Sequence, residues 1–173
     1  DLGRAMLQAA EEANQVVYRR SVEEESCRGM GTTIVAAAVD GSRVFVVNVG
    51  DSRCYLADQE AITQITRDHS LVEDLVSRGE ITPEEARSHP RKNLITRALG
   101  VDPSVRPDLY ELDRQPGSFL LLCSDGLSNL VTDPELLYEI IHGGDPSDCC
   151  RRLLDIALSR GAPDNVTAVL MQL

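Results

Sequence analysis

Hydrophobic positions near the start of the chain recur every three or four residues. Because an α-helix turns once in about 3.6 residues, this spacing gathers them on one face of a helix. Residues 1–20 are therefore predicted to form a helix whose buried face contains Leu2, Met6, Leu7, Ala10, Ala13 and Val17.

The pattern then changes to two apolar runs rich in β-branched residues, 32–39 and 44–49, separated by Asp40-Gly41. This dipeptide between apolar runs is typical of a hairpin turn, so the runs are predicted to pair as antiparallel strands. Residues 55–57 and 61–66 predict a second, shorter hairpin.

Residues that begin helices follow in the middle of the chain. Ser70 with Glu73, and Thr82 with Glu85, have the spacing of capping boxes, and Pro83 suits the first position of a helix. Two short helices are predicted here.

The last third of the chain alternates between strands and helices. Strands are predicted at residues 105–112, 119–123 and 166–173. Helices are predicted to begin at Asp133-Pro134 and at Asp145-Pro146, with the second ending near Ser159.

This order of elements predicts an α+β fold in a single domain, residues 1–173, with a mixed sheet, antiparallel hairpins and helices packed outside. A doubly wound nucleotide-binding fold is disfavoured, because no G-x-G-x-x-G or G-x-x-x-x-G-K-[ST] loop follows a predicted strand.

Composition narrows the choice of partners. The net charge of -11 argues against binding to a nucleic-acid backbone and suits cations better. No apolar run reaches the roughly 18–20 residues that span a bilayer, so a soluble form is expected. The 5 cysteines are scattered without a C-x-x-C spacing, which favours buried, reduced thiols in a cytoplasmic protein.

Three aspartates occupy the same kind of position, in a turn with glycine or proline at the end of an apolar strand. They are Asp51, Asp125 and Asp164. Carboxylates about 4–6 Å apart would repel unless protonated or bound to cations, and cations are the more favourable solution at neutral pH. Because no histidine or cysteine has ligand spacing, Mg²⁺ or Mn²⁺ is favoured over zinc. A single aspartate in a turn more often caps a backbone amide, so only the three together indicate a metal site.

Five motifs, in this order, resemble those of the PPM (type 2C) protein phosphatases. The stretch 79–100 also resembles the flap segment of the bacterial members. The five motifs are Gly29-Met30-Gly31-Thr32-Thr33, Val49-Gly50-Asp51-Ser52-Arg53, Asp68-His69-Ser70, Cys123-Ser124-Asp125-Gly126-Leu127 and Gly161-Ala162-Pro163-Asp164-Asn165-Val166-Thr167.

The resemblance implies a sandwich of two mixed, largely antiparallel sheets flanked by helices in α-β-β-α layers, without the N-terminal strands of the domain. It implies two or three Mn²⁺ or Mg²⁺ ions. Asp125 would be shared between metals, Asp164 would complete the ligands of the core pair from this chain, and Asp51 would hold an additional ion. Asn165 would orient the loop that carries Asp164.

The implied mechanism uses water activated by two metals to attack phosphorus in line, with Asp125 and Asp164 as the catalytic ligands. Other phosphatase chemistries fit poorly. No cysteine is followed six positions later by arginine, no Asp-x-Asp occurs, and the 3 histidines are dispersed.

Two elements of the family pattern have no match in this sequence. One is an Asp-Gly-x-Gly-Gly motif that completes the metal pair, and the other is an upstream arginine that grips phosphate. The 173 residues alone are therefore expected to be catalytically incomplete.

The histidines are interpreted first as surface or capping residues. His69 lies beside a helix cap and His142 at a helix end. His89 is the better functional candidate, because with Arg87 and Arg91 it belongs to a basic segment that could meet an anionic phosphoprotein.

The leading hypothesis is a cytoplasmic, monomeric enzyme that removes phosphate from serine and threonine of proteins and opposes a kinase in bacterial signalling. The alternative is a catalytically inactive pseudophosphatase or regulatory module of the same fold. A third reading makes the acidic turns purely structural, in which case Mn²⁺ would leave the melting temperature unchanged.

Overall fold

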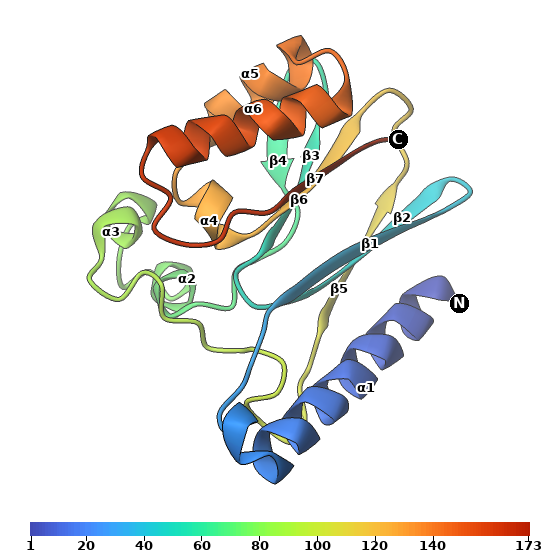
Figure 1. The fold of residues 1–173 in the computed structure, drawn as a ribbon. Helices are drawn as coiled ribbons and strands as arrows, with labels where there is room; N and C mark the ends of the chain where they lie inside the picture. Colours follow the sequence, from blue (N-terminus) through green and yellow to red (C-terminus); the bar gives the residue numbers. More distant parts are fainter. The chain divides into compact units, whose positions relative to one another are not determined.

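The computed structural model describes residues 1–173 (Figure 1). The chain divides into two compact units. The first consists of Asp1–Ala36, Val47–Asp51 and Arg67–Leu109, and the second of Ala37–Val46, Ser52–Thr66 and Tyr110–Leu173.

Helices and strands follow one another in nearly the predicted order. The helices are α1 (Leu2–Glu23), the 3₁₀ turn η1 (Glu25–Cys27), α2 (Leu71–Ser77), α3 (Pro83–Ser88), α4 (Asp125–Ser128), α5 (Asp133–His142) and α6 (Pro146–Ser159). The strands are β1 (Ile34–Asp40), β2 (Arg43–Val49), β3 (Arg53–Ala57), β4 (Ile62–Gln64), β5 (Asp108–Asp113), β6 (Phe119–Cys123) and β7 (Ala168–Gln172).

The strands form two sheets, with the orders β1-β2-β5 and β4-β3-β6-β7. In the second sheet every neighbouring pair is antiparallel. Both predicted hairpins are present, and Gly41 adopts a φ of 58° in the turn between β1 and β2. These sheets with their helices confirm the predicted α+β class.

In the first unit, α1 holds a loop through polar groups on its buried face. Asn14 is fully buried, accepts a hydrogen bond from the Gly100 backbone N–H at 2.8 Å and donates one to the Asp102 carbonyl at 3.1 Å. Ser21 Oγ lies 3.3 Å from the Gly100 carbonyl. The helix therefore fixes the loop through specific hydrogen bonds. Of the six residues predicted for its buried face, Ala10 is buried and the other five are partly buried.

The two short helices of the first unit begin as predicted. The Ser70 hydroxyl accepts a hydrogen bond from the Glu73 backbone N–H at the start of α2. At the start of α3, Thr82 and Glu85 form a complete capping box, followed by a proline in the first turn. Each cap satisfies backbone N–H groups that a helix leaves without partners.

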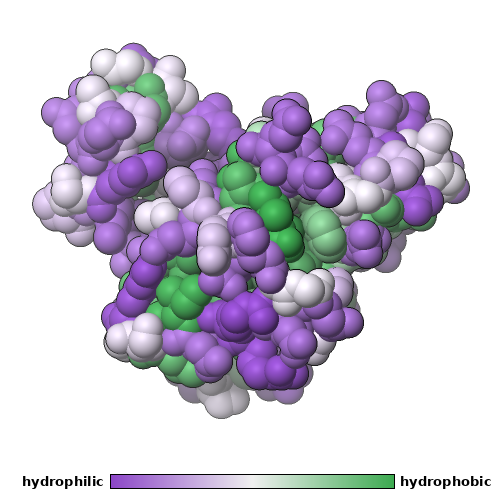
Figure 2. Space-filling view, turned by 90° about the horizontal axis from the view of Figure 1, so that it is seen from above, coloured by the Kyte–Doolittle hydropathy of each residue, from purple (hydrophilic) through white to green (hydrophobic).

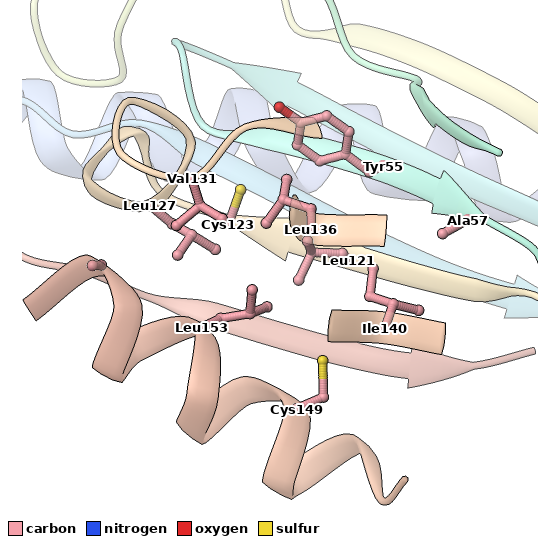
Figure 3. Packing of buried hydrophobic residues seen from close by; sticks show 11 residues of the cluster. Tyr55, Ala57, Leu121, Cys123, Leu127, Val131, Leu136, Ile140, Cys149 and Leu153 are labelled. Carbon is pink, nitrogen blue, oxygen red and sulfur yellow. The ribbon is translucent and has the colours of Figure 1, made fainter. Parts of the chain in front are cut away.

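The second unit has one contiguous hydrophobic core between its sheet and two helices. Figure 1 shows α5 and α6 side by side over one face of the sheet β4-β3-β6-β7, and Figure 3 shows the side chains between them. Leu121, Leu136 and Leu153 are completely buried there. Apart from Tyr55 and two cysteines the core is aliphatic, in keeping with the 3% aromatic content. The full cluster is Tyr55, Ala57, Leu121, Cys123, Leu127, Val131, Leu136, Ile140, Cys149, Leu153 and Ala157.

Differences from the sequence prediction include the starts of two strands and one short helix. Strand β5 begins at Asp108 instead of residue 105, and β7 begins at Ala168 instead of residue 166. The single-turn helix α4 was missed, because four residues are too few to show a helical period. Its first residue is Asp125, so this aspartate begins a helix instead of lying in an open turn.

The face shown in Figure 2 is mostly hydrophilic, with hydrophobic residues in places between the hydrophilic ones. None of the helices combines the length and the apolar character needed to cross a membrane. Large apolar side chains that are more than half exposed are Val16, Val22, Val101, Tyr138, Leu158 and Val169.

Candidate metal centre

The loops that carry Asp125 and Asp164 start from the same end of two neighbouring strands. Because β6 and β7 are antiparallel, with Cys123 opposite Ala168, the end of β6 lies beside the beginning of β7. Asp125 follows β6 and Asp164 precedes β7, so the sheet itself brings the two loops together.

Ser124 joins these two loops by three hydrogen bonds. Its backbone N–H donates to the Thr167 carbonyl at 3.1 Å, and its hydroxyl accepts from the Thr167 backbone N–H at 3.0 Å. The hydroxyl also donates to the Asn165 carbonyl at 3.3 Å. The positions of Asp125 and Asp164 are therefore coupled through one serine between them.

Gly126 allows the two loops to approach closely. A Cβ atom at this position would lie 2.2 Å from the Asn165 carbonyl oxygen and 3.1 Å from the Asn165 carbonyl carbon. No side chain fits in that space, because real Cβ atoms do not approach backbone atoms at 2.2 Å. The glycine next to Asp125 is thus a condition for the contact with the loop of Asp164.

Both carboxylates are accessible from solvent and receive local hydrogen bonds. The Asn129 side-chain amide donates to Asp125 Oδ2 at 3.3 Å, and the Asn165 backbone N–H donates to Asp164 Oδ1 at 2.7 Å. Asn165 thus contacts both loops through its backbone. Carboxylate oxygens in this arrangement are the donor type that Mg²⁺ and Mn²⁺ prefer.

Asp51 lies in the first unit, in the turn that follows β2, one residue after Gly50. Hydrogen bonds to Gly50 fix this turn. The Gly50 N–H donates to His69 Nδ1 at 3.0 Å. The Gly50 carbonyl accepts from the His69 backbone N–H at 2.9 Å and from Asn48 Nδ2 at 3.2 Å. Gly50 has a φ of 114°, and a Cβ there would lie 2.3 Å from Thr33 Cγ2. This turn therefore requires glycine.

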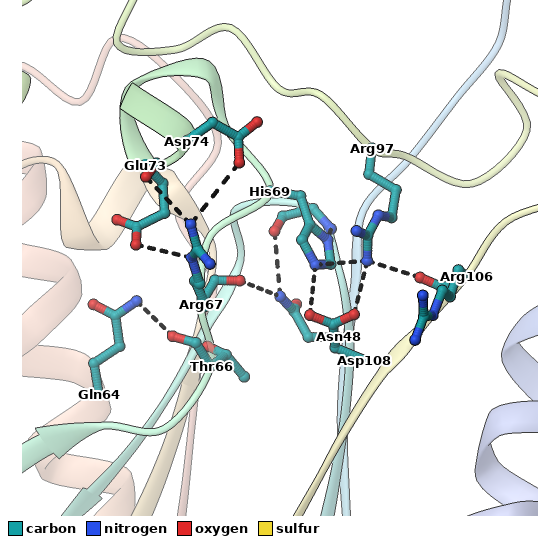
Figure 4. Close-up of polar contacts among 11 residues, drawn as sticks. Asn48, Gln64, Thr66, Arg67, His69, Glu73, Asp74, Arg97, Arg106 and Asp108 are labelled. Carbon is teal, nitrogen blue, oxygen red and sulfur yellow. Dashed lines mark hydrogen bonds and ion pairs between the residues drawn. The ribbon is translucent and has the colours of Figure 1, made fainter. Parts of the chain in front are cut away.

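The expectation of a surface or capping role for His69 is wrong. Only 6% of the residue is exposed, and Figure 4 shows its ring beside the side chains of Asp108 and Arg97. His69 Nε2 lies 3.0 Å from Asp108 Oδ2, and Arg97 Nη1 lies 2.8 Å from Asp108 Oδ1. Sequence reasoning missed Asp108 and Arg97, because they come from distant positions with no shared motif.

His69 and Arg97 change the acidity of Asp108. Burial is the largest single influence and opposes the charged form, but the hydrogen bonds and charges of His69 and Arg97 together outweigh it. The pKa of Asp108 is therefore lowered from its ordinary value. A carboxyl group whose pKa is lowered on folding stabilises the native state above the unfolded pKa, about 3.9, and this contribution is lost as the pH falls through the folded value.

The stability of the protein is accordingly expected to fall on acidification below about pH 4, and Asp108→Asn is expected to make that fall shallower. Urea unfolding of both proteins from about pH 6 to about pH 3 measures the difference. If the free energy of unfolding falls equally with pH in both proteins, Asp108 contributes nothing to the loss of stability at low pH.

The basic segment lies on the surface of the first unit, where it begins in the last turn of α3 with Arg87 and continues after the helix. Arg87 and Arg91 are exposed and His89 is half-buried. His89 Nδ1 accepts a hydrogen bond from the Arg91 backbone N–H at 3.1 Å, so one ring nitrogen is engaged in a local turn. The cationic side chains of the two arginines remain accessible to a partner.

Comparisons with known proteins agree with this arrangement. The family described as Protein phosphatase 2C matches residues 1–75. The serine/threonine phosphatase stp of Listeria monocytogenes serotype 4b is 41% identical over 162 residues, which is 94% of this chain and 64% of that protein. The crystal structure of the serine/threonine phosphatase Stp1 from Staphylococcus aureus superimposes with a TM-score of 0.94 at 40% identity, covering 98% of this chain and 67% of that one. The catalytic domain of the serine threonine protein phosphatase PstP, solved with 2 manganese ions, gives a TM-score of 0.88 at 39% identity, covering 98% of this chain and 70% of that one.

The chain belongs to the protein phosphatase 2C family. The resemblance read from its motifs is thereby confirmed, as is the bacterial character of its relatives. The chain spans just under two thirds of the length of the Listeria relatives.

Within this phosphatase 2C chain, the candidate ligands are distributed over both units. Asp51 belongs to the first unit, whereas Asp125 and Asp164 belong to the second. Neither unit by itself groups three His, Cys, Asp or Glu side chains into a set that could hold a metal ion. The loops of Asp125 and Asp164 are the pair that the second unit brings together through its own strands and hydrogen bonds.

Proposed function

We propose that the protein containing this chain removes phosphate from phosphoserine and phosphothreonine of other proteins in a metal-dependent reaction. The observation that carries the proposal is the joining of the Asp125 and Asp164 loops at one edge of the sheet through Ser124. Relatives at 41% and 44% identity are named serine/threonine phosphatases, which supports the same activity here.

In this proposal Asp125 and Asp164 hold the core metal ions, and Asp51 holds an additional one. Their all-oxygen donor set suits Mn²⁺ or Mg²⁺. Manganese is favoured by the two ions in the related PstP catalytic domain. When bound, such ions lower the pKa of a coordinated water and neutralise charge on the phosphoryl oxygens.

The residues of the chain supply positioning. Ser124 fixes the spacing of the two loops, and the Asn165 backbone N–H restrains one oxygen of Asp164. Fixed ligand positions matter because a misplacement of about 1 Å can cost a hundredfold in rate. The exposed Arg87 and Arg91, with His89, would contact acidic phosphoprotein substrates.

The partners proposed are phosphorylated proteins of a pathway driven by a Ser/Thr kinase. A cytoplasmic location is proposed because Cys54, Cys123 and Cys149 are buried free thiols, which suit a reducing compartment. A monomer is the simplest assembly for such an enzyme.

Phosphate release by the full-length gene product tests the activity. With Mn²⁺, peptides carrying phosphothreonine or phosphoserine are expected to be hydrolysed, EDTA is expected to stop the reaction, and added Mn²⁺ is expected to restore it. Release that persists in EDTA, or that is confined to phosphotyrosine, would contradict the proposal.

In the same assay, changing Arg87 and Arg91 to alanine is expected to raise KM for acidic phosphopeptides several-fold with little change in kcat. An unchanged KM would remove the basic segment from substrate binding.

A further inference from the structure

The backbone of Gly50, directly before the proposed metal ligand Asp51, forms two hydrogen bonds with the buried His69. Its N–H donates to His69 Nδ1 at 3.0 Å, and its carbonyl accepts from the His69 backbone N–H at 2.9 Å. Because His69 holds both the N–H and the carbonyl of Gly50, the backbone on either side of this glycine has little freedom to rotate.

The chemistry of these contacts fixes the tautomer of His69. A backbone N–H can only donate, so Nδ1, which faces the Gly50 N–H, carries no proton. The ring proton is then on Nε2, which donates to Asp108 Oδ2 at 3.0 Å. Arg97 Nη1 lies 2.9 Å from Nε2. Because both nitrogens carry protons, no hydrogen bond forms between them, and Arg97 Nη1 donates to Asp108 Oδ1 at 2.8 Å instead.

Arg97 and Asp108 therefore hold the imidazole in the orientation that the Gly50 contact needs. Arg97 is itself fixed by a 2.8 Å hydrogen bond from Nη1 to the Arg106 carbonyl. Figure 4 shows the carboxylate of Asp108 between the ring of His69 and the guanidinium of Arg97. A carboxylate behind a histidine is a common way of fixing its tautomer and ring plane.

The same residues close the base of segment 70–96, which contains α2 and α3. The segment begins after His69 and ends before Arg97, and its two stems are joined between Ser70 and Ile95. The Thr96 backbone N–H donates to the His69 carbonyl at 2.8 Å. One anchor thus serves both the Asp51 turn and this segment.

We propose that His69, held by Asp108 and Arg97, is a positioning residue that sets the backbone of the Asp51 turn and thereby the affinity of Asp51 for its metal ion. The inference rests on the proposed metal-dependent function. Residues behind a ligand typically change metal affinity or activity by roughly 10- to 100-fold when replaced.

Mn²⁺ titration of the full-length protein, followed by the electron paramagnetic resonance signal of free Mn²⁺, measures this effect without an activity assay. In His69→Leu, one Mn²⁺ is expected to bind roughly 10- to 100-fold more weakly. His69→Asn can still offer an oxygen to the Gly50 N–H, so it is expected to recover part of the affinity. The matched control is His142→Leu, which replaces an exposed histidine of α5 and is expected to bind Mn²⁺ like the wild type.

A double-mutant comparison separates positioning from a general structural role. If His69 acts through Asp51, His69→Leu is expected to cause no further loss of Mn²⁺ binding in a protein that already carries Asp51→Asn. Equal losses in the two backgrounds would overturn the proposal, as would wild-type Mn²⁺ binding by a folded His69→Leu protein.

Two further variants keep the test decisive. If His69→Leu does not fold, Asp108→Asn takes its place, because it keeps the size of the side chain. It must weaken the binding of the same Mn²⁺ ion, and unchanged binding overturns the proposal. Unchanged Mn²⁺ binding in Asp51→Asn would also overturn it, because Asp51 would then hold no metal. The proposed function is judged separately, by whether Asp125→Asn loses Mn²⁺ binding and phosphate release.

Discussion

Replacing Asp125 by asparagine is expected to reduce kcat by on the order of a thousandfold or more, because a metal ligand supplies several kcal/mol of transition-state stabilisation and each 1.36 kcal/mol is about tenfold in rate. Asparagine keeps the shape of the side chain and can still contact Asn129, which donates to Asp125 Oδ2 in the wild type. The change therefore removes the negative charge and little else. Single-turnover and steady-state phosphate release by the full-length protein measure the loss.

The binding of Mn²⁺ is expected to weaken in the same variant, because a charged ligand is removed. Asp155→Asn is the matched control, because this exposed aspartate lies on α6. Activity within tenfold of the wild type in Asp125→Asn, with an unchanged requirement for Mn²⁺, would show that Asp125 is no metal ligand.

Sequence patterns predicted most of the secondary structure because the signals are local. Asp40-Gly41 set the first hairpin, and Thr82 with Glu85 set the cap of α3, each within a few residues. The neighbourhood of Asp125 and Asp164 was also predictable, since both are positioned by the ends of strands that pair directly.

The environment of His69 could not be predicted in the same way. The residues that fix its ring, Arg97 and Asp108, are 28 and 39 residues away, and no periodic pattern connects them. Polar residues around a helix cap suggest an exposed position, whereas here tertiary contacts bury the ring. Local polarity is thus a poor guide wherever a buried network satisfies every polar group of a side chain.

The single-turn helix α4 shows the same limit for the candidate site. Sequence analysis placed Asp125 in a turn with Gly126, but not in the first turn of a helix that packs on the loop of Asp164. The need for glycine at this position comes from the approach of the Asn165 carbonyl, 39 positions further along the chain. Only the folded sheet makes that approach visible.

Gly126→Ala is accordingly expected to separate the two aspartate loops and to lower kcat by about a hundredfold, the typical cost of moving a catalytic group by about 1 Å. The new methyl group would begin 2.2 Å from the Asn165 carbonyl oxygen, and the obstacle is backbone that cannot rotate away as a flexible side chain would. Overpacking of this kind also costs about 1–3 kcal/mol of stability, which urea unfolding measures.

Gly117→Ala separates the loss of activity from the loss of stability. Gly117 has a φ of 87°, so alanine there is strained by roughly 1–2 kcal/mol, yet a Cβ at this position meets no atom within 4 Å. Both variants are therefore expected to unfold at lower urea concentration, but only Gly126→Ala is expected to lose activity at temperatures where both proteins are folded. Equal kcat values for the two folded variants would mean that the approach of Gly126 to Asn165 has no part in catalysis. A selective loss in Gly126→Ala, together with weaker Mn²⁺ binding, would tie the catalytic rate to the spacing between the loops of Asp125 and Asp164.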